Sequence, residues 1–416
     1  MTDTGRVLHH PEALPAIQGT RASITAPVGT LPLPPLLLLF SFVNLVIGSA
    51  AFVNTGLLEP MAASMGVSVA AVGQTTTVYA VSVALLAPLL LASLGRLPQR
   101  GALALAMGLY TAGNVLTAVA QDLTTLLGAR VLMGLGSVAT PLMAGIAVAM
   151  IPPERRARGL ALVFLGVSLS YVVGLPLGAW AGLGWGWRVP TWAAAALTAV
   201  SGLALWLAVP RGTHGAAGPA LAGFARLLRD RAALAVLSLT FTYFIAIFVV
   251  FAYIGPVLTD IVPMDRNTLS LAISAFGVAA VGGTLLGGRL TDRRGPRATL
   301  TFGLSGLVIC LLLLPLTARH PAWMVGMMMA WGMTGFSMMA AQQTRLAVIA
   351  GPQTALALSL NTSMIYLGTA TGGALGGLAL TMLEARYLPW VGAPFGLLAL
   401  VWMRASLKGS TQARAG

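Results

Sequence analysis

The sequence predicts an all-α membrane protein with twelve transmembrane helices in two six-helix bundles related by a pseudo-two-fold axis along the membrane normal. Apolar residues occupy 57% of the 416 positions and charged residues 8%, whereas a soluble domain averages roughly 25% charged residues. A span needs about 20 apolar residues, so this composition supplies about twelve. The apolar residues form long runs and do not alternate with polar ones, which excludes an outer-membrane barrel.

Twelve apolar runs, separated by glycine, proline and charged residues, define the expected spans. Residues 1–35 carry several Pro and Gly residues and both signs of charge, so we expect a flexible cytoplasmic arm. The N-terminal bundle, 36–209, contains the runs 36–58, 68–94, 102–121, 126–150, 159–182 and 189–209. After a polar cytoplasmic linker, 210–232, the C-terminal bundle, 233–405, contains the runs 233–258, 268–290, 298–318, 322–344, 354–383 and 388–405. A cytoplasmic tail, 406–416, follows.

Basic residues are distributed unevenly between alternate loops. With a cytoplasmic N-terminus, 19 of the 24 basic residues lie in segments on that side and 4 on the other, while Arg130 lies inside a span. Basic residues in short loops stay in the cytoplasm. We therefore expect a multi-pass protein of the cell (inner) membrane with both termini in the cytoplasm.

An internal repeat supports the division into six and six spans. Gly95-Arg-Leu-Pro-Gln-Arg-Gly101 follows span 2 and Gly288-Arg-Leu-Thr-Asp-Arg-Arg-Gly295 follows span 8, with their first glycines 193 positions apart. Gly174-x-x-x-Gly178 in span 5 matches Gly372-x-x-x-Gly376 in span 11, 198 positions apart. Similar offsets indicate a duplicated six-helix unit, an arrangement found in one major transporter architecture.

Several classes of function lack the residues that they need. Cys310 is the one cysteine, and the four histidines fall in the arm or in expected loops, so we expect no metal site. No G-x-x-x-x-G-K-[ST] loop for a nucleotide phosphate occurs, and we expect no cofactor. The spans lack the clustered His, Asp or Glu of a membrane-embedded enzyme. Topology explains the net charge of +14 better than nucleic-acid binding does.

A charged, glycine-containing motif follows span 8: Gly288-x-Leu290-x-Asp292-Arg293-x-Gly295-x-Arg297. The corresponding stretch after span 2 keeps Arg96 and Arg100 but lacks the acid. An Asp can pair with Arg and with a helix N-terminus, while arginines complement a helix C-terminus. In these motifs the chain resembles the major facilitator superfamily along nearly its whole ordered length. The resemblance implies that these residues brace the cytoplasmic ends of helices and gate the protein; the alternative is that they only set topology.

Two further motifs carry the resemblance. An ionisable residue at membrane depth is a functional hypothesis by default, and Arg130, in Arg-Val-Leu-Met-Gly134, is similar to the family's span-4 signature, which implies a role in substrate or proton coupling. The alternative is an Arg that reaches the outer interface. The span-5 residues Gly166, Gly174, Pro176 and Gly178 resemble the signature of its exporters, with Gly-x-Pro where Gly-Pro is common. The similar group is the twelve-span drug:proton antiporters, including arabinose, purine and chloramphenicol exporters. Small residues and a proline suggest a pliable seam between the two bundles.

Candidates for binding a small molecule lie mainly on spans that line the central cavity in this family. The substrate-binding candidates are Asn44, Asn54, Thr55, Tyr243, Phe244, Phe248, Phe251, Trp331, Met338, Gln342 and Asn361. An apolar, aromatic lining with few polar groups suits a neutral or lipophilic molecule. The alternative for each residue is ordinary packing or contact with lipid.

The sequence leaves energy coupling open, because no Asp, Glu or His falls near the middle of an expected span. Glu59, near the outer end of span 1, is the best titratable candidate to carry a proton. Asp122, near the outer end of span 4, and Arg130 are the other coupling candidates.

These observations favour a monomeric secondary active transporter that exports a small organic molecule (drug-like, sugar or nucleobase-like) by alternating access as a proton antiporter. Two alternatives stay open. A passive facilitator or importer of a small neutral solute would fit the scarcity of carboxylates in the spans. A non-transporting membrane receptor or sensor would bind its ligand without flux.

Overall fold

The apolar runs form helices throughout the part of the chain that the computed structural model describes, residues 33–94, 97–152, 155–210, 227, 229–317 and 321–412. Several helices begin at the capping residues that a sequence of this kind provides. Ser68 accepts a hydrogen bond from the Ala71 amide, Asp122 from that of Thr125, and Asp265 from that of Thr268. The predicted arm and linker fall almost entirely outside the described residues.

The N-terminal bundle contains α1 to α10. Its elements are α1 (Leu33–Phe52), α2 (Leu58–Met65), α3 (Val69–Val81), α4 (Ala87–Leu94), α5 (Gln99–Val119), α6 (Leu123–Gly136), α7 (Ala139–Met150), α8 (Arg156–Leu169), α9 (Leu175–Trp185) and α10 (Arg188–Ala208). Two π-helical turns, η2 (Ser82–Leu86) and η4 (Ser170–Gly174), join α3 to α4 and α8 to α9. Spans 2 and 5 are therefore continuous, and each contains one turn that holds one residue more than an α-helical turn.

The C-terminal bundle repeats this order. Its elements are α12 (Arg231–Phe251), α13 (Ile254–Ile261), α14 (Arg266–Leu313), α15 (Pro321–Ala350), α16 (Thr354–Ala379) and α17 (Leu388–Gln412). The 48 residues of α14 are two helices joined at a kink, where Gly295 has φ 80°. A positive φ favours glycine, and Pro296 cannot continue the first helix. The kink divides α14 into spans 8 and 9.

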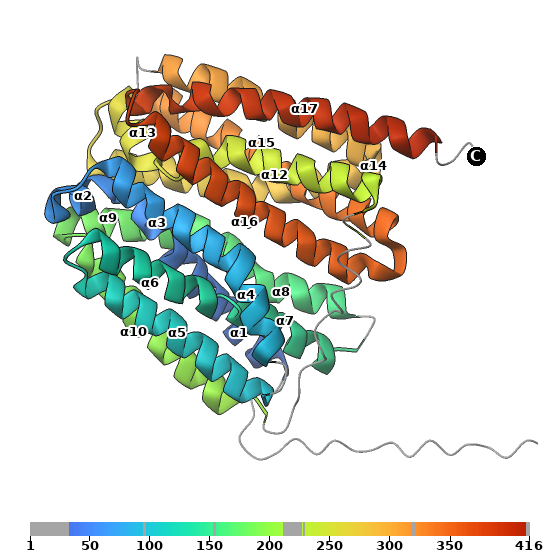
Figure 1. The fold of residues 1–416 in the computed structure, drawn as a ribbon, viewed down its shortest axis with the longest axis horizontal. Helices are drawn as coiled ribbons and strands as arrows, with labels where there is room; N and C mark the ends of the chain where they lie inside the picture. Colours follow the sequence, from blue (N-terminus) through green and yellow to red (C-terminus); the bar gives the residue numbers. More distant parts are fainter. Residues whose placement is uncertain are drawn as a thin grey trace, which may run out of the picture.

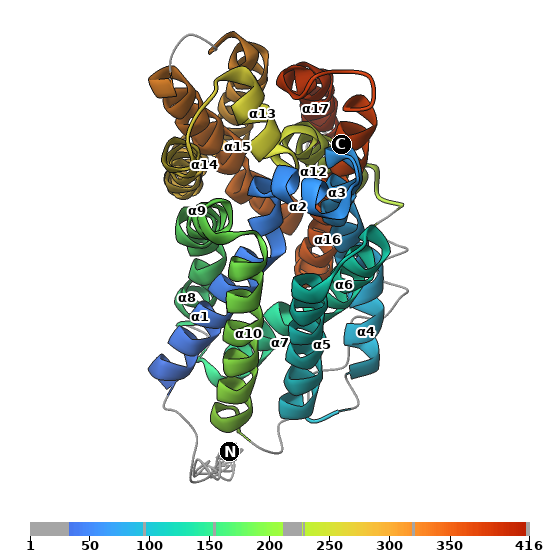
Figure 2. The ribbon, with the colours of Figure 1, turned by 90° about the vertical axis from the view of Figure 1, so that its left-hand side faces the viewer.

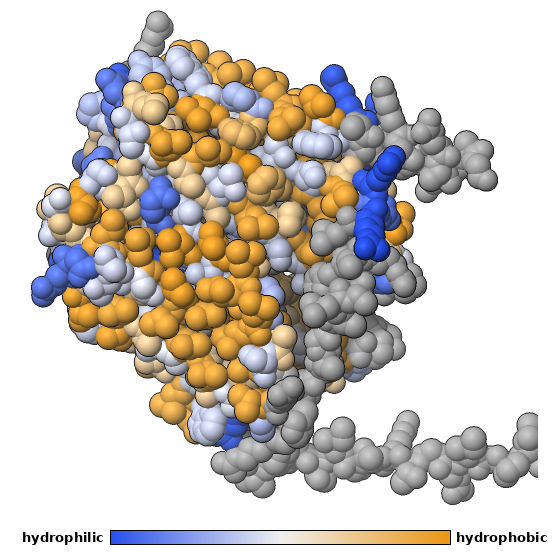
Figure 3. Space-filling view, viewed as in Figure 1, coloured by the Kyte–Doolittle hydropathy of each residue, from blue (hydrophilic) through white to orange (hydrophobic). Residues whose placement is uncertain are grey.

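The structure accounts for most of the twelve expected spans when this kink is taken into account. Nine helical segments of the described chain are long and apolar enough to cross a membrane, and the segment Arg266–Thr317 is one of them. Dividing it at Gly295 gives ten such segments, and α16 and α17, of 26 and 25 residues, lie where the last two spans are expected. Figure 3 shows the apolar side chains that cover the flank of the molecule, as contact with lipid requires.

The two bundles lie side by side, with α12 to α17 above and α1 to α10 below in Figure 1. At the left end of that view, α2, α9 and α13 come together, and Figure 2 shows this end face-on. We call it the packed end. The opposite end, where α4 ends and α8 begins, we call the cavity end.

Two predicted spans, 36–58 and 233–258, break before they reach the packed end. α1 ends at Phe52 and α12 at Phe251, and the short helices α2 and α13 follow. Pro60 and Pro256 are each the third residue of the short helix, where a helix tolerates proline that its interior would not. The two prolines are 196 positions apart, so the breaks belong to the internal repeat.

Each half contains one buried hydrogen-bond network that joins three helices. In the N-terminal network, Thr140 donates to the Asn44 Oδ1 (2.7 Å) and Asn44 donates to the Val163 carbonyl (3.0 Å). In the C-terminal network, Gln342 donates to Thr240 (2.9 Å) and to the Val236 carbonyl (3.0 Å), and Thr240 donates to Asn361 (2.7 Å). Both networks link spans in the order 4–1–5 or its repeat, 10–7–11.

We predict that Gln342→Met destabilises the fold by about 1–2 kcal/mol, because two interhelical hydrogen bonds disappear and the Thr240 hydroxyl loses a donor. Thermal unfolding of the purified protein in detergent measures this. Gln343→Met, at the exposed neighbouring position, is the matched control and should leave the melting temperature near that of the parent. Equal melting temperatures for the two variants would contradict a stabilising network.

Candidate functional site

A cavity of about 450 Å³ lies between the two halves and reaches from the middle of the molecule toward the cavity end. The N-terminal half contributes residues of α1, α3, η2, α4, the α6–α7 junction, α7, α8 and η4, and the C-terminal half contributes residues of α12 and α16. Pockets of about 300–1,000 Å³ are typical of small-molecule sites. The cavity therefore has room for a small organic ligand that would touch both halves at once.

Aromatic rings from both halves form the inner wall of this cavity. Phe52, Tyr79 and Tyr171 come from the N-terminal half, and Phe244, Phe248 and Tyr366 from the C-terminal half. Rings meet across the interface, with centroid distances of 5.9 Å for Phe52–Phe248 and 6.4 Å for Tyr79–Tyr366. Such offset and edge-to-face contacts are favourable and offer flat apolar surface to a ligand.

Hydroxyl groups, and no acidic or histidine side chain, make up much of the polar lining. Thr140, Ser170, Ser363 and Thr369 border the cavity, and Asn44, which also borders it, is already bonded within the N-terminal network. Within the described residues, no group of three or more His, Cys, Asp or Glu could hold a metal ion. The polar part of the lining therefore consists of uncharged groups.

The structure places three of the predicted binding residues in the cavity wall: Asn44, Phe244 and Phe248. The others lie outside the lining in this conformation and are almost fully buried: Asn54, Thr55, Tyr243, Phe251, Trp331, Met338, Gln342 and Asn361. Gln342 and Asn361 belong to the C-terminal network, and Thr55 donates to the carbonyl of Phe52, the last residue of α1 (2.7 Å). Phe251 lies directly behind the wall, 5.5 Å from Phe248 between ring centroids.

The sequence reasoning missed the cavity residues of spans 2, 5 and 11. Candidates were expected mainly on spans 1, 4, 7 and 10. The cavity residues Tyr79, Tyr171 and Tyr366 lie instead on α3, η4 and α16. A tyrosine in the middle of an apolar run is a signal that was present, because its hydroxyl needs a polar partner or access to water. No residue of α15, which carries span 10, borders the cavity.

Arg130 is buried in α6, with 2% of its surface exposed. Its Nη1 donates to the carbonyls of Ala50 and Ala51 on α1, at 3.4 and 3.1 Å, and contacts the Met133 sulfur at 3.7 Å. Its Nε has no hydrogen-bond partner. The side chain therefore does not reach the outer interface, and no carboxylate is among these partners. A buried cation without a carboxylate is costly, so the fold alone gives no reason to keep it.

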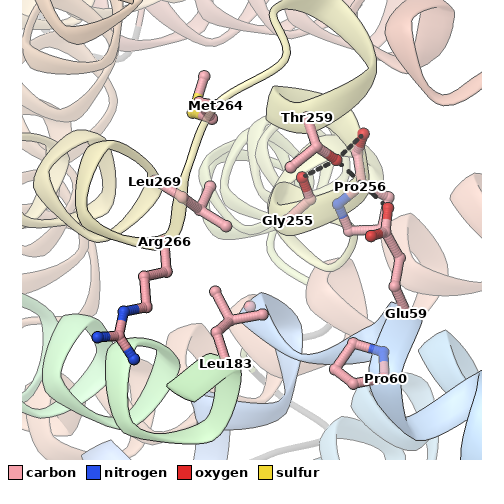
Figure 4. A pocket seen from close by; sticks show the side chains of 10 residues that line it. Glu59, Pro60, Leu183, Gly255, Pro256, Thr259, Met264, Arg266 and Leu269 are labelled. Atoms are coloured by element: carbon pink, nitrogen blue, oxygen red, sulfur yellow. Dashed lines mark hydrogen bonds between the residues drawn. The ribbon is translucent and has the colours of Figure 1, made fainter.

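Glu59 lies at the packed end, in a smaller pocket of about 280 Å³ between the two halves (Figure 4). Its carboxylate accepts a hydrogen bond from Thr259 of α13 at 3.3 Å, and Arg266 lines the other side of the pocket. The Glu59 side chain is exposed. In this conformation it joins the halves at their outer surface and lies outside the central cavity.

Asp122 caps the N-terminus of α6. The amide and the hydroxyl of Thr125 both donate to its carboxylate, at 2.8 Å each, and these hydrogen bonds hold its pKa below the ordinary value of an aspartate. It therefore stays ionised near neutral pH. This geometry gives Asp122 a capping role.

Further contacts close the packed end. The Tyr253 hydroxyl accepts from Gln74 of α3 (3.2 Å) and donates to the Gly373 carbonyl of α16 (2.9 Å). On the opposite side of the interface, Trp180 of α9 donates to Asn267 of α14 (2.9 Å). The Gln74–Tyr253 and Trp180–Asn267 hydrogen bonds thus hold the two halves together at this end.

The span-5 glycines do not form a seam between the two bundles, and this expectation is corrected. A Cβ on Gly166, Gly174 or Gly178 would overlap Ser41, Ser49 or Val53, all of the α1 span in the same half. Glycine permits this close approach of two helix backbones. Pro176 is the second residue of α9, just after the π-helical turn η4. These glycines therefore form close contacts inside the N-terminal bundle, whereas span 5 meets the other half where Tyr171 touches Gly277 of α14.

The described residues of the two charged gating motifs lie at the cavity end. Asp292, Arg293 and Arg297 are exposed around the kink at Gly295, and Gly288 has open space beside it. Arg100 packs its guanidinium over the Trp206 ring of α10, 4.2 Å from the centroid. Arg96 lies outside the described residues.

Known proteins resemble this chain along most of its length. It is 32% identical to the inner membrane transport protein YdhP of Escherichia coli (strain K12) over 364 residues, covering 85% of this chain and 91% of the relative. It is 28% identical to a probable sugar efflux transporter of Helicobacter pylori (strain G27), covering 88% and 93%. Among solved structures, a bacterial homolog of the human lysosomal transporter Spinster has a TM-score of 0.74 at 17% identity, covering 91% of this chain and 98% of that one.

The family model of the Major Facilitator Superfamily matches residues 39–261 and again residues 236–414. The two matches together cover nearly all of the described helices. The relative that is 32% identical covers 85% of this chain. The chain is therefore a membrane transporter that belongs to the Major Facilitator Superfamily.

Proposed function

We propose that this protein exports a small, uncharged organic molecule by alternating access, in exchange for protons. The observation that carries the proposal is the central cavity, which both halves line and which the packed end closes on one side. A site shared by two bundles changes its access when the bundles rock against each other. Efflux is further supported by the resemblance to the probable sugar efflux transporters of Helicobacter pylori.

The lining supports a substrate that combines a flat apolar face with a few hydroxyl or carbonyl groups. Seven aromatic rings and several Ser and Thr hydroxyls border the cavity, without an acidic side chain. An organic cation would find no carboxylate there, and the buried charge of Arg130 lies behind Ala51 of the same wall. Uncharged sugar-like, nucleobase-like and drug-like molecules share the chemistry that this site would accept.

We place the protein in the cell (inner) membrane as a monomer, with both termini in the cytoplasm. The excess of basic residues on that side supports this orientation. The cavity end would then face the cytoplasm, where Asp292, Arg293 and Arg297 lie. The structure would represent the state that takes up substrate from the cell.

Two residues support a coupled mechanism. Arg130 of α6 is a buried cation that donates hydrogen bonds to the carbonyls of Ala50 and Ala51 on α1. Because Ala51 borders the cavity, a movement of α6 would shift the cavity wall. Glu59 bridges the halves at the packed end, where opening would break its hydrogen bond with Thr259. Passive facilitation is the second candidate function, because the cavity lining contains no group that titrates near neutral pH.

Proteoliposomes loaded with a panel of sugars, nucleobases and neutral drugs should release one class faster when a pH gradient is imposed. We predict that Glu59→Gln abolishes gradient-driven flux and keeps substrate exchange, because the amide cannot bind and release the proton. Glu384→Gln, a surface carboxylate paired with Arg386, is the control and should behave like the parent. If the flux does not depend on the pH gradient in any variant, passive facilitation is supported.

We predict that Arg130→Met lowers transport by at least about tenfold while the melting temperature stays equal or rises. Replacing a buried charge with an apolar side chain of similar size is often neutral or stabilising, so lost transport would come from lost function. The measurements are flux into vesicles and thermal unfolding of the same preparation. Full transport by Arg130→Met would remove this residue from the mechanism.

We predict that Phe248→Ala weakens binding of the substrate by about tenfold, because the ligand loses one aromatic contact worth about 1.5 kcal/mol. The shift in melting temperature with increasing ligand measures the affinity. Phe302→Ala removes a phenylalanine that is 39% exposed on α14 and lies outside the cavity. If both variants bind equally well, the ligand does not occupy this cavity.

A further inference from the structure

Two turns of the described helices are π-helical, and both lie in the N-terminal half. They are η2 (Ser82–Leu86) in span 2 and η4 (Ser170–Gly174) in span 5. The corresponding spans of the other half, the first part of α14 and α16, keep α-helical geometry until the kink at Gly295 and the end of α16. A π-helical turn holds one residue more than an α-helical turn, and such turns occur mostly at functional sites.

Each π-helical turn begins with a buried serine that rests against a glycine of a neighbouring span. Ser82 and Ser170 are 2% and 1% exposed. A Cβ on Gly134 of α6 would overlap the Ser82 side chain, and a Cβ on Gly48 of α1 would overlap that of Ser170. The contact between spans 2 and 4 is thus of the same kind as the contact between spans 5 and 1. In both, a serine at the start of a π-helical turn packs against a glycine of the neighbouring span.

The serine hydroxyls also bond to the helix turn that precedes them. Ser82 donates to the Val78 carbonyl at 2.8 Å, and Ser170 donates to the Val167 carbonyl at 2.7 Å. A serine that bonds back in this way offers the backbone an alternative to the regular helix ladder and often bends a helix. The glycine opposite leaves room for this geometry, which any larger residue would fill.

Both turns shape the central cavity. Val83 of η2 and Ser170 and Tyr171 of η4 border it. The Tyr171 ring lies 5.8 Å from Phe52 in its own half and 5.6 Å from Phe336 in the other half, between centroids. The extra residue of η4 thus helps to aim an aromatic side chain at the place where the two halves meet.

The turn in span 5 also contacts the C-terminal half through its backbone. A Cβ on Gly277 of α14 would overlap the Tyr171 carbonyl, so the two helices touch at this point. η4 therefore lies between Gly48 on one side and Gly277 on the other. A change in its geometry would alter the cavity wall and the interface of the halves together.

We propose that Ser170 and Ser82 are positioning residues, whose contacts with Gly48 and Gly134 hold two π-helical turns that set the shape of the central cavity.

A helix turns by about 100° per residue. If η4 became α-helical, the part of span 5 before it would rotate by this angle relative to the part after it. Phe164, which borders the cavity and is 43% exposed, would then leave the cavity wall. The inference rests on the proposed function only in naming the cavity as the substrate site.

The test needs no substrate. In the full chain with Cys310→Ser, Phe164→Cys provides a single thiol in the cavity wall, and its reaction rate with a charged methanethiosulfonate reagent reports exposure to water. We expect Gly48→Ala to slow this reaction by roughly an order of magnitude, because a thiol that leaves water forms its reactive thiolate less readily. Gly48→Ala with Ser170→Gly should restore the rate, since the added methyl group occupies the space of the removed side chain. Gly145→Ala, where the added methyl group meets nothing within 4 Å, is the matched control.

The same test can be repeated independently on span 2. In its double variant the methyl group added at Gly134 takes the place of the Ser82 side chain that is removed. Leu91→Cys, also in the cavity wall, should react more slowly in Gly134→Ala and at the parental rate in Gly134→Ala with Ser82→Gly. Thermal unfolding identifies the folded preparations. A parental rate in folded Gly48→Ala and Gly134→Ala, or folded double variants that stay slow, would overturn the proposal. A failed transport screen would overturn the proposed function and leave the thiol rates unaffected.

Discussion

A polar group inside a lipid-embedded helix must find its hydrogen-bond partner within the protein, because the surrounding hydrocarbon offers none. The two three-helix networks show how this constraint organises the fold. Asn44 and Thr140 satisfy each other across α1 and α7, and Thr240 and Gln342 do so across α12 and α15. Each network closes within one half. Each half is thereby a self-contained unit, and the large cavity lies between the units.

The contacts between the halves are of a different kind. Aromatic rings such as those of Phe52 and Phe248 touch across the cavity, and glycines such as Gly277 allow backbones to approach. Hydrogen bonds between the halves, including Gln74–Tyr253 and Trp180–Asn267, gather toward the packed end. When such aromatic and glycine contacts separate, few buried polar groups lose a hydrogen-bond partner. This suits two units that move against each other. Arg130 forms hydrogen bonds within one half, as the two networks do, since its carbonyl partners lie on α1 of the same half.

The sequence predicted the fold better than it predicted the site. The apolar runs, the division into two halves and the charged motif before Gly295 all have local causes. The exact ends of spans 1 and 7 were missed, although Pro60 and Pro256 mark them. Of the predicted cavity residues, Phe244 and Phe248 were found and Tyr79, Tyr171 and Tyr366 were not. Gln342 and Asn361 were expected to face a ligand, yet their polar groups are used inside the C-terminal network.

The amino-acid sequence by itself determined which segments enter the membrane, because burial in lipid depends on the composition of each run of about 20 residues. It also determined the internal repeat, since duplicated prolines and glycines keep a nearly constant spacing. Only the tertiary structure decided which polar side chains border the cavity and which bond to another helix. That choice depends on how each helix is rotated about its axis. The rotation is set by distant contacts, such as Gly48 with Ser170 and Gly134 with Ser82, and no single run of residues contains them.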